Sequence, residues 1–242
     1  MKTKAGEVLT FRYKFSFENG VTKEFAVRLD KGTFQLLTEP KTEHPEWTQL
    51  EFNKCSNCPL DPAKHKYCPI AVNIVDIISF FKDLISYEKT YMAIENEQRT
   101  YIGKVSLQEG IKSLIGLYMV TSGCPVMDKL RPMVLIHVPF PTLRESIYKL
   151  ISMYLLAQYF MGKQGKTPDW SLKKLVELCA EIQIVNRSFF KRIREQKVKD
   201  ASLNAIVALD SSAVYTASSI EDDNLDEIRE LFRGFLDEPT KV

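Results

Sequence analysis

The chain has 242 residues, of which 45% are hydrophobic and 26% are charged, and its formal net charge is +2 at pH 7. This composition is ordinary for a folded globular protein, and it supplies enough apolar residues for one large domain or two small ones. The near balance of charge gives no overall reason to expect binding to nucleic acid or to a membrane surface.

The N-terminal segment MKTKAGEVLTFRYKF has no apolar core and no small-residue cleavage site of the kind found in secretory signal peptides. We therefore expect no export and a cytoplasmic location, where thiols stay reduced. The cysteine count agrees with this expectation, because five cysteines, an odd number, cannot all pair in disulfides.

Two stretches of alternating apolar and polar residues, 9–17 and 25–29, predict a β-hairpin. A two-residue turn at Asn19 and Gly20 would place the two apolar sets on opposite faces of the sheet. A three-residue loop over 18–20 keeps them on one face, because the side-chain period of a strand is two residues. We expect this longer loop, with Gly20 in the left-handed conformation.

A third strand is expected over Thr33–Leu37, followed by an irregular, proline-rich region over residues 38–69. A helix then begins at Pro69, and its apolar residues form a stripe that extends to Ile85. The segment Lys89–Val105 predicts a second hairpin.

Beyond this hairpin the sequence predicts helices almost throughout. Two capping boxes, in which Ser106 precedes Glu109 and Thr142 precedes Glu145, mark helix starts. The most apolar stretch, Ile147–Met161, is shorter than the ~20 residues of a membrane span, so we expect a buried core helix. The expected helices cover residues 107–122, 147–161, about 170–196, 201–214 and part of 224–236.

These elements predict an α+β protein with a small N-terminal antiparallel sheet, a cysteine-rich metal loop, and a largely helical middle and C-terminal part. We expect residues 1–69 to hold the hairpin sheet and the cysteine-rich loop, and residues 70–242 to be mainly helical. Both parts are expected to share one core, as a single domain overall.

The stretch CSNCPLDPAKHKYCP predicts a metal site. Cys55 and Cys58 have the C-x-x-C spacing that lets two thiolates bind one ion, Cys68 follows, and Cys124 in TSGCP is the natural fourth ligand of a tetrahedral zinc site. Cys68 and Cys124 each precede a proline that suits the first position of a helix. We therefore expect both at helix starts, where free N–H groups favour the thiolate.

Other interpretations of these cysteines stay open. Cys-Pro steps are also found in iron–sulfur proteins, although the spacing here matches neither common ferredoxin pattern. A C-x-x-C pair can also carry thiol redox chemistry. His65 lies between Cys58 and Cys68 and is the alternative to Cys124 as fourth ligand. Cys179 is in phase with the apolar stripe of a helix, which indicates a buried thiol.

His137, in RPMVLIHVPFPTLRE, is the one candidate for catalysis. A histidine beside an incompletely thiolate-bound metal could assist hydrolysis, and Cys124 is close in sequence. The plainer interpretation is a packed histidine between Ile136 and Val138. The common signatures of serine hydrolases, zinc proteases and nucleotide-binding enzymes do not occur.

Arg187, Lys191 and Arg194 fall on one face of a predicted helix. Such a face can hold phosphate or RNA. More often it is the solvated side of a helix, and cations suit a helix C-terminus. Nucleic acid is therefore a secondary expectation for this chain.

The segments FRYKFSFENGVTKEF, CSNCPL, YCPIAVN, SLQEGIKSLIGLYMVTSGCP, LRPM, HVPF and YLLAQYF together resemble an uncharacterised family of bacterial proteins of about this length. The resemblance covers most of the chain and implies a bacterial cytoplasmic origin. It implies no activity.

The leading expectation is an intracellular binding or regulatory protein with a structural zinc ion, because four thiolates leave no position on zinc for a water molecule. The alternative is an enzyme, either with an iron–sulfur or thiol redox centre or with His137 as part of a metal-assisted hydrolase. The partner would be an unidentified protein or small molecule, and the sequence is compatible with a homo-oligomer.

Overall fold

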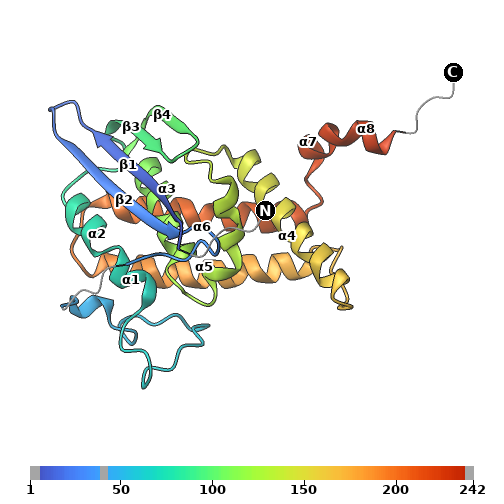
Figure 1. The fold of residues 1–242 in the computed structure, drawn as a ribbon, viewed down its shortest axis with the longest axis horizontal. Coiled ribbons are helices and arrows are strands. Elements are labelled where there is room, and N and C mark those ends of the chain that lie inside the picture. The colour runs from blue at the N-terminus through green and yellow to red at the C-terminus, as the bar shows by residue number, and fades with distance from the viewer. Residues whose placement is uncertain (1–5, 39–42, 238–242) are drawn as a thin grey trace. The chain divides into compact units, whose positions relative to one another are not determined.

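The computed structural model describes residues 6–38 and 43–237 (Figure 1). The chain divides into two compact units, residues 1–140 with 182–210 and residues 141–181 with 211–242. The boundary that the sequence suggested at residue 69 falls inside the first unit. None of the helices in the described part of the chain combines the length and the apolar character that crossing a membrane would need.

The first unit is built on a four-stranded antiparallel sheet. Its strands are β1 (Val8–Ser16), β2 (Thr22–Asp30), β3 (Lys89–Glu95) and β4 (Thr100–Ser106), in the spatial order β2-β1-β3-β4. Both predicted hairpins are present, and with the helices that follow they confirm the α+β class.

The register of the first hairpin is the predicted one. Tyr13 pairs with Phe25, and the Phe17 N–H donates to the Val21 carbonyl at 2.9 Å, which leaves a three-residue loop over 18–20. Gly20 has a φ of +83°, in the left-handed region where glycine is favoured. The alternation of the sequence thus determines which face of the hairpin is buried.

The predicted third strand, Thr33–Leu37, does not form. Phe34 has a φ of 56°, and a left-handed residue cannot continue a strand. Only an isolated bridge between Leu29 and Leu36 is present.

The helix predicted from Pro69 is interrupted. It begins at Pro69 as expected, but it is split into α1 (Pro69–Asn73) and α2 (Val75–Phe81), and the residue between them, Ile74, has φ −109° and ψ 7°. The Asn73 side chain donates to the Pro69 carbonyl at 2.7 Å, beside this break. The apolar stripe is buried from Ile70 to Phe81 despite the interruption, but α2 ends at Phe81 and does not extend to Ile85 as predicted.

Both capping boxes are confirmed. Ser106 caps α3 (Leu107–Thr121) together with Glu109, and Thr142 caps α4 (Leu143–Lys163) together with Glu145. A Cβ atom on Gly110 of α3 would lie only 2.9 Å from the Phe15 ring, so glycine lets this helix lie close against the inner face of the sheet (Figure 1).

The core of the first unit lies between the sheet and α3. It includes side chains from three strands and from α2, which are Phe11, Tyr13, Phe15, Phe25, Val27, Leu29, Met92, Ile94, Ile77, Ile78 and Phe81. After α3 a 3₁₀ helix covers Met127–Ile136.

Helix α4 forms where the sequence predicted it, but only one of its faces is buried. Ile147, Leu150 and Tyr154 are buried, as a core helix requires. Leu156 and Phe160 are each 55% exposed, so the segment is amphipathic and the expectation of a fully buried helix is wrong.

Two long helices, α5 (Lys173–Arg194) and α6 (Asp200–Glu221), each contribute residues to both units. The expected C-terminal segment forms α7 (Asp226–Arg229), a 3₁₀ turn (Glu230–Phe232) and α8 (Arg233–Leu236). Earlier in the chain, a short 3₁₀ helix covers Glu46–Thr48.

Candidate metal centre

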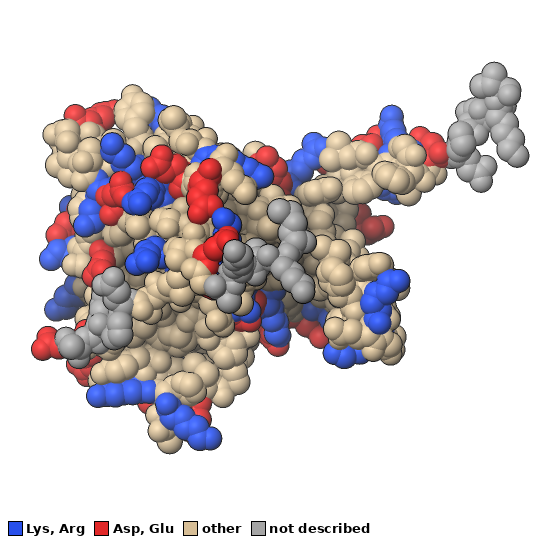
Figure 2. Space-filling view, in the orientation of Figure 1, with Lys and Arg blue, Asp and Glu red and all other residues tan. Residues whose placement is uncertain are grey.

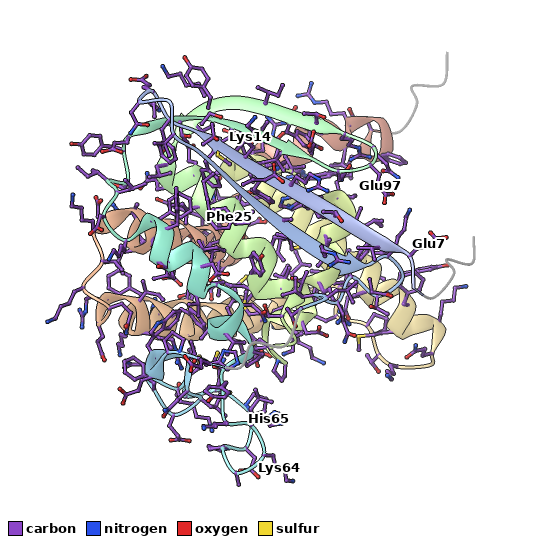
Figure 3. The ribbon with its side chains drawn as sticks, turned by 60° about the vertical axis from the view of Figure 1, so that its left-hand side comes forward. Glu7, Lys14, Phe25, Lys64, His65 and Glu97 are labelled. Carbon is purple, nitrogen blue, oxygen red and sulfur yellow. The ribbon has the colours of Figure 1, made fainter. Side chains whose placement is uncertain are left out.

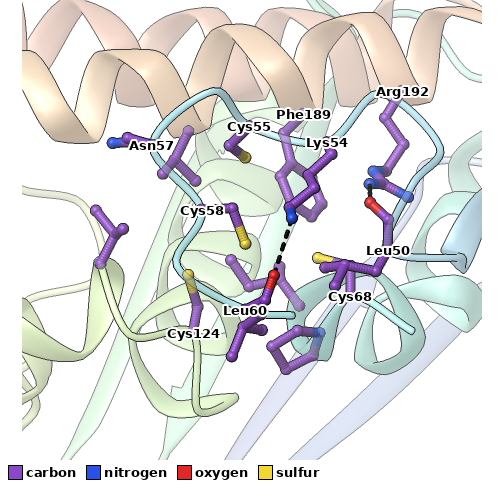
Figure 4. A pocket seen from close by; sticks show the side chains of 14 residues that line it. Leu50, Lys54, Cys55, Asn57, Cys58, Leu60, Cys68, Cys124, Phe189 and Arg192 are labelled. Carbon is purple, nitrogen blue, oxygen red and sulfur yellow. Dashed lines mark hydrogen bonds between the residues drawn. The ribbon is translucent and has the colours of Figure 1, made fainter. Parts of the chain in front are cut away.

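Four of the five cysteines line one small cavity in the first unit, with a volume of about 20 Å³ (Figure 4). They are Cys55, Cys58, Cys68 and Cys124, the four ligands that the sequence predicted. In Figure 4 Cys55 and Cys58 reach the cavity from one loop, and Cys68 and Cys124 from two other segments. The walls come from the cysteine-rich loop, the start of α1, the segment after α3, and α5.

The C-x-x-C pair lies on a tight turn. The Cys58 N–H donates to the Cys55 carbonyl at 3.0 Å, which brings both side chains to one side of the loop. The Lys54 ammonium donates to the Leu60 carbonyl at 2.9 Å and closes the loop around this turn. The local backbone therefore supports the convergence that the spacing predicts.

Cys68 is the residue that precedes α1, with Pro69 in the first helical position, as predicted. Its own N–H donates to the Thr48 carbonyl at 2.8 Å, and the neighbouring Tyr67 forms a β-bridge with Gln49. The Cys68 side chain is 8% exposed. This cysteine is thus held in place by backbone pairing on one side and by a helix on the other.

Cys124 follows α3 after Gly123, which has a φ of +84°. The prediction that Cys124 caps a helix holds only in part. The residue that precedes the 3₁₀ helix is Val126, although the Cys124 carbonyl accepts a hydrogen bond from the Asp128 N–H at 2.9 Å.

Burial raises the pKa of Cys55, Cys68 and Cys124. It raises the pKa of Cys55 to about 11, with the neighbouring cysteines adding to the effect and Ser188 opposing it. Burial also raises the pKa of Cys68 and of Cys124, and it outweighs the lowering by the backbone N–H groups at the start of α1 and after Cys124. The N–H groups favour the thiolate, as expected, but desolvation has the stronger effect, so the net pKa of each of these two thiols is raised. A bound metal would supply the missing charge, since a coordinating thiol is deprotonated.

Arg192 is a residue of the candidate site that the sequence patterns did not single out. It lies within the basic run of α5, but it is 2% exposed and lines the cysteine cavity. Its guanidinium donates to the carbonyls of Trp47, Gln49 at 2.8 Å and Leu50 at 3.4 Å. Its position in the helical repeat could have indicated its burial, because Arg192 follows Val185 and Phe189 at helical spacing on the buried face of α5.

Arg192 has no carboxylate within ion-pair distance among the residues that the structure describes. Its positive charge lowers the pKa of Cys68, and burial lowers the pKa of Arg192 itself. A buried cation beside four thiols favours their ionised form.

The four sulfurs are not yet placed at the distances that metal coordination requires. Within residues 6–38 and 43–237, no group of three or more His, Cys, Asp or Glu side chains is arranged to hold a metal ion as it stands. An ion would require the sulfurs to close around it at about 2.3 Å. The cysteine-rich loop can move inward to allow this, because no residue from Glu51 to Lys66 is buried and fixed by packing.

The other sequence candidates lie apart from this cavity. His65 is exposed at the tip of the cysteine-rich loop, next to Lys64 (Figure 3), and does not line the cavity. Cys179 is fully buried in α5, as predicted, and burial raises its pKa to about 11. Of the two candidates for the fourth position, only Cys124 faces the other three cysteines.

His137 packs against the sheet. Its Nε2 lies 2.5 Å from the Tyr13 hydroxyl, which also lies 3.1 Å from the Ser113 Oγ. The His137 ring meets Phe11 edge to face, with a centroid distance of 5.2 Å. His137 does not line the cysteine cavity, and this favours the packed histidine over the hydrolytic one.

Arg187, Lys191 and Arg194 are all exposed on α5. The Arg187 Nε lies 3.6 Å from Asp210, and the Arg194 guanidinium lies 6.0 Å from the centre of the Phe190 ring. On the face shown in Figure 2, basic and acidic side chains are interspersed rather than gathered by sign. These observations favour a solvated face over a nucleic-acid site.

No curated protein and no solved structure matches this chain. A family model described as a domain of unknown function, DUF6901, matches residues 11–233. This match covers most of the sequence, as the resemblance implied. The chain therefore belongs to the DUF6901 family.

Proposed function

We propose that the chain binds one divalent metal ion, most simply Zn²⁺, through Cys55, Cys58, Cys68 and Cys124, and that the ion is structural in a binding or regulatory protein. The observation that carries this proposal is that cysteines from three separate segments line one cavity. Cysteines that only fill the core are not expected to gather around one cavity from a polar, irregular loop, whereas metal ligands are.

The donor set supports the choice of metal. Four sulfurs suit zinc and other thiophilic ions, whereas magnesium and calcium require oxygen ligands. No carboxylate lines the cavity. Its volume of about 20 Å³ suits a single ion better than a cluster of several irons, since one water molecule already needs roughly 10–15 Å³ on the same measure.

A structural role follows from the ligand count. Four thiolates complete a tetrahedral shell and leave zinc no open position for substrate or water. Apolar side chains, among them Ile70, Val126 and Phe189, form other parts of the wall. The ion would fasten the cysteine-rich loop to α1 and to the end of α3, which are separated in sequence.

An iron–sulfur centre is the second candidate. The Cys-Pro steps at Cys58, Cys68 and Cys124 favour it, because clusters often use them. A brown protein with absorbance near roughly 400 nm would indicate this cofactor.

The proposed site has consequences for the location and the partners of the protein. A cytoplasmic location would keep the thiols reduced and available for metal. Because four thiolates would leave the ion no open position, the partner is expected at another part of the molecule, as a protein or a small ligand. A homo-oligomer is compatible with this assignment.

Metal analysis of anaerobically purified protein tests the proposal. The wild-type chain should contain one zinc ion, Cys124→Ser should lose it, and Cys179→Ser should retain it because Cys179 is buried away from the cavity. Equal metal content in the two variants, or a wild-type protein without metal after purification with added zinc, would contradict the assignment.

A further inference from the structure

We infer that Arg192 and Lys54 are the counter-cations of the proposed metal site, and that they make its metal-bound sulfurs poor nucleophiles. The inference rests on the proposed function and extends it. The two cations would protect the metal-bound sulfurs against thiol-modifying electrophiles, so that the sulfurs are not readily alkylated or exchanged.

The charge of the site requires partners. A divalent ion bound by four thiolates carries a net charge of −2, and burying an uncompensated charge is costly. Two cationic side chains, Arg192 and Lys54, line the cavity, and no carboxylate does. The sum of the ion, the four thiolates and the two cations is zero.

Arg192 is held in place independently of any metal. Its guanidinium bonds to carbonyls of residues 47, 49 and 50, and those acceptors carry no full charge. It interacts electrostatically with Cys68, Cys55 and Cys58, and less strongly with the Glu195 carboxylate. Its charge is therefore fixed beside the sulfurs, and no carboxylate among the described residues forms an ion pair with it.

Lys54 also lines the cavity, from the cysteine-rich loop. Its ammonium is partly buried and bonds only a carbonyl, that of Leu60, among the described residues. Figure 4 shows the Lys54 amine reaching over the cavity between Cys55 and Leu60. A second positive charge thus lines the cavity, from within the loop that carries Cys55 and Cys58.

These charges bear on sulfur reactivity. In alkylation by iodoacetamide, a sulfur electron pair attacks the carbon, a C–S bond forms, the C–I bond breaks and iodide leaves. The resulting thioether is a weak zinc ligand, so the ion is released. Nearby cations stabilise the electron pair on the thiolate and thereby slow the attack.

The test is the rate of zinc release when zinc-loaded protein reacts with iodoacetamide in the presence of a chromophoric chelator. We expect Lys54→Met to release zinc faster than wild type by on the order of tenfold. Lys191→Met is the matched control, since Lys191 is exposed on α5 beside Arg192 and should leave the rate unchanged.

Arg192 needs a second pair of variants because it also holds the segment around Gln49. Arg192→Lys retains the charge and should keep zinc release slow even if the melting temperature falls. Arg192→Met removes the charge as well as the hydrogen bonds, so it should both release zinc faster and melt at a lower temperature than wild type. Equal release rates in Lys54→Met, Arg192→Met and wild type would overturn this inference while leaving metal binding intact. A wild-type protein without metal would instead overturn the proposed function and this inference together.

Discussion

The first unit contains two regions that are held together by different means. In the sheet, α2 and α3, large side chains such as Phe15, Phe81 and Leu107 are almost completely buried. In the cysteine-rich loop, no residue from Glu51 to Lys66 is buried. Ordering a residue costs about 1–2 kcal/mol of backbone entropy, which apolar burial offsets in the first region but not in the second.

The loop therefore depends on specific polar links. These are the backbone pairing of Gln49 with Tyr67, the buried Arg192 that bonds three carbonyls, and, in our proposal, the metal. The comparison teaches that a region without a core can be ordered if a few strong interactions close it at several points. It also predicts that the two regions respond to different perturbations.

The largest effect is expected in the sheet core. Phe15→Ala should destabilise the protein by about 3–5 kcal/mol, because it removes a fully buried ring that contacts α2 and the second strand. Urea unfolding measures the change. Zinc content should stay at the wild-type level in native buffer, and its loss would show that the two regions are not separable.

Removing the metal should act on the other region. If the ion binds only the folded state, a thousandfold excess of free zinc over Kd contributes about 4 kcal/mol. Chelation should therefore lower stability by a comparable amount and open the loop, which limited proteolysis between Glu51 and Lys66 would detect. Tritium or deuterium exchange at the amides of β1 and β3 should change much less. Uniform loss of protection would contradict the comparison.

A smaller effect is expected at the tip of the first hairpin. Gly20→Val should cost about 1 kcal/mol, because Gly20 has a φ of +83° and a β-branched residue resists that conformation. A Cβ atom there would meet no other atom within 4 Å, so the cost is conformational alone. Gly20→Asn is the matched control, since asparagine tolerates the left-handed region. Equal melting temperatures for the three proteins would contradict the assigned loop.

The smallest effect is the acid response of Asp200. Its carboxylate accepts hydrogen bonds from the Ser86 N–H at 2.9 Å and hydroxyl at 2.7 Å, and these bonds lower its pKa. A depressed pKa means that the contribution to stability is present above the unfolded value of about 3.9 and is lost as the pH falls toward the folded value.

Because Asp200 is only partly buried, solvent screens these interactions and the contribution should stay below about 1 kcal/mol. Unfolding free energies of Asp200→Asn and wild type at pH 7 and in mild acid would measure it. The difference between the two proteins should shrink as the pH falls. A difference that grows instead would show that the carboxylate is not the stabilised form.

Much of the local structure could be predicted from the sequence, because it depends on short-range rules. Alternation over 9–17 determined the hairpin register, and the two capping boxes determined where α3 and α4 begin. The spacing of Cys55 and Cys58, together with the Cys-Pro steps at Cys68 and Cys124, was enough to select the four cysteines that line the cavity. Each of these signals spans only a few residues of chain.

Contacts between distant segments were decided by the tertiary structure. Cys124 rather than His65 faces the other three cysteines because the end of α3 packs beside α1, whereas the tip of the loop extends outward. Arg192 is buried because segment 47–50 supplies three carbonyl acceptors at the right place. A charged residue in a basic run becomes a core residue only when another part of the chain satisfies its donors, and no local pattern encodes that partner.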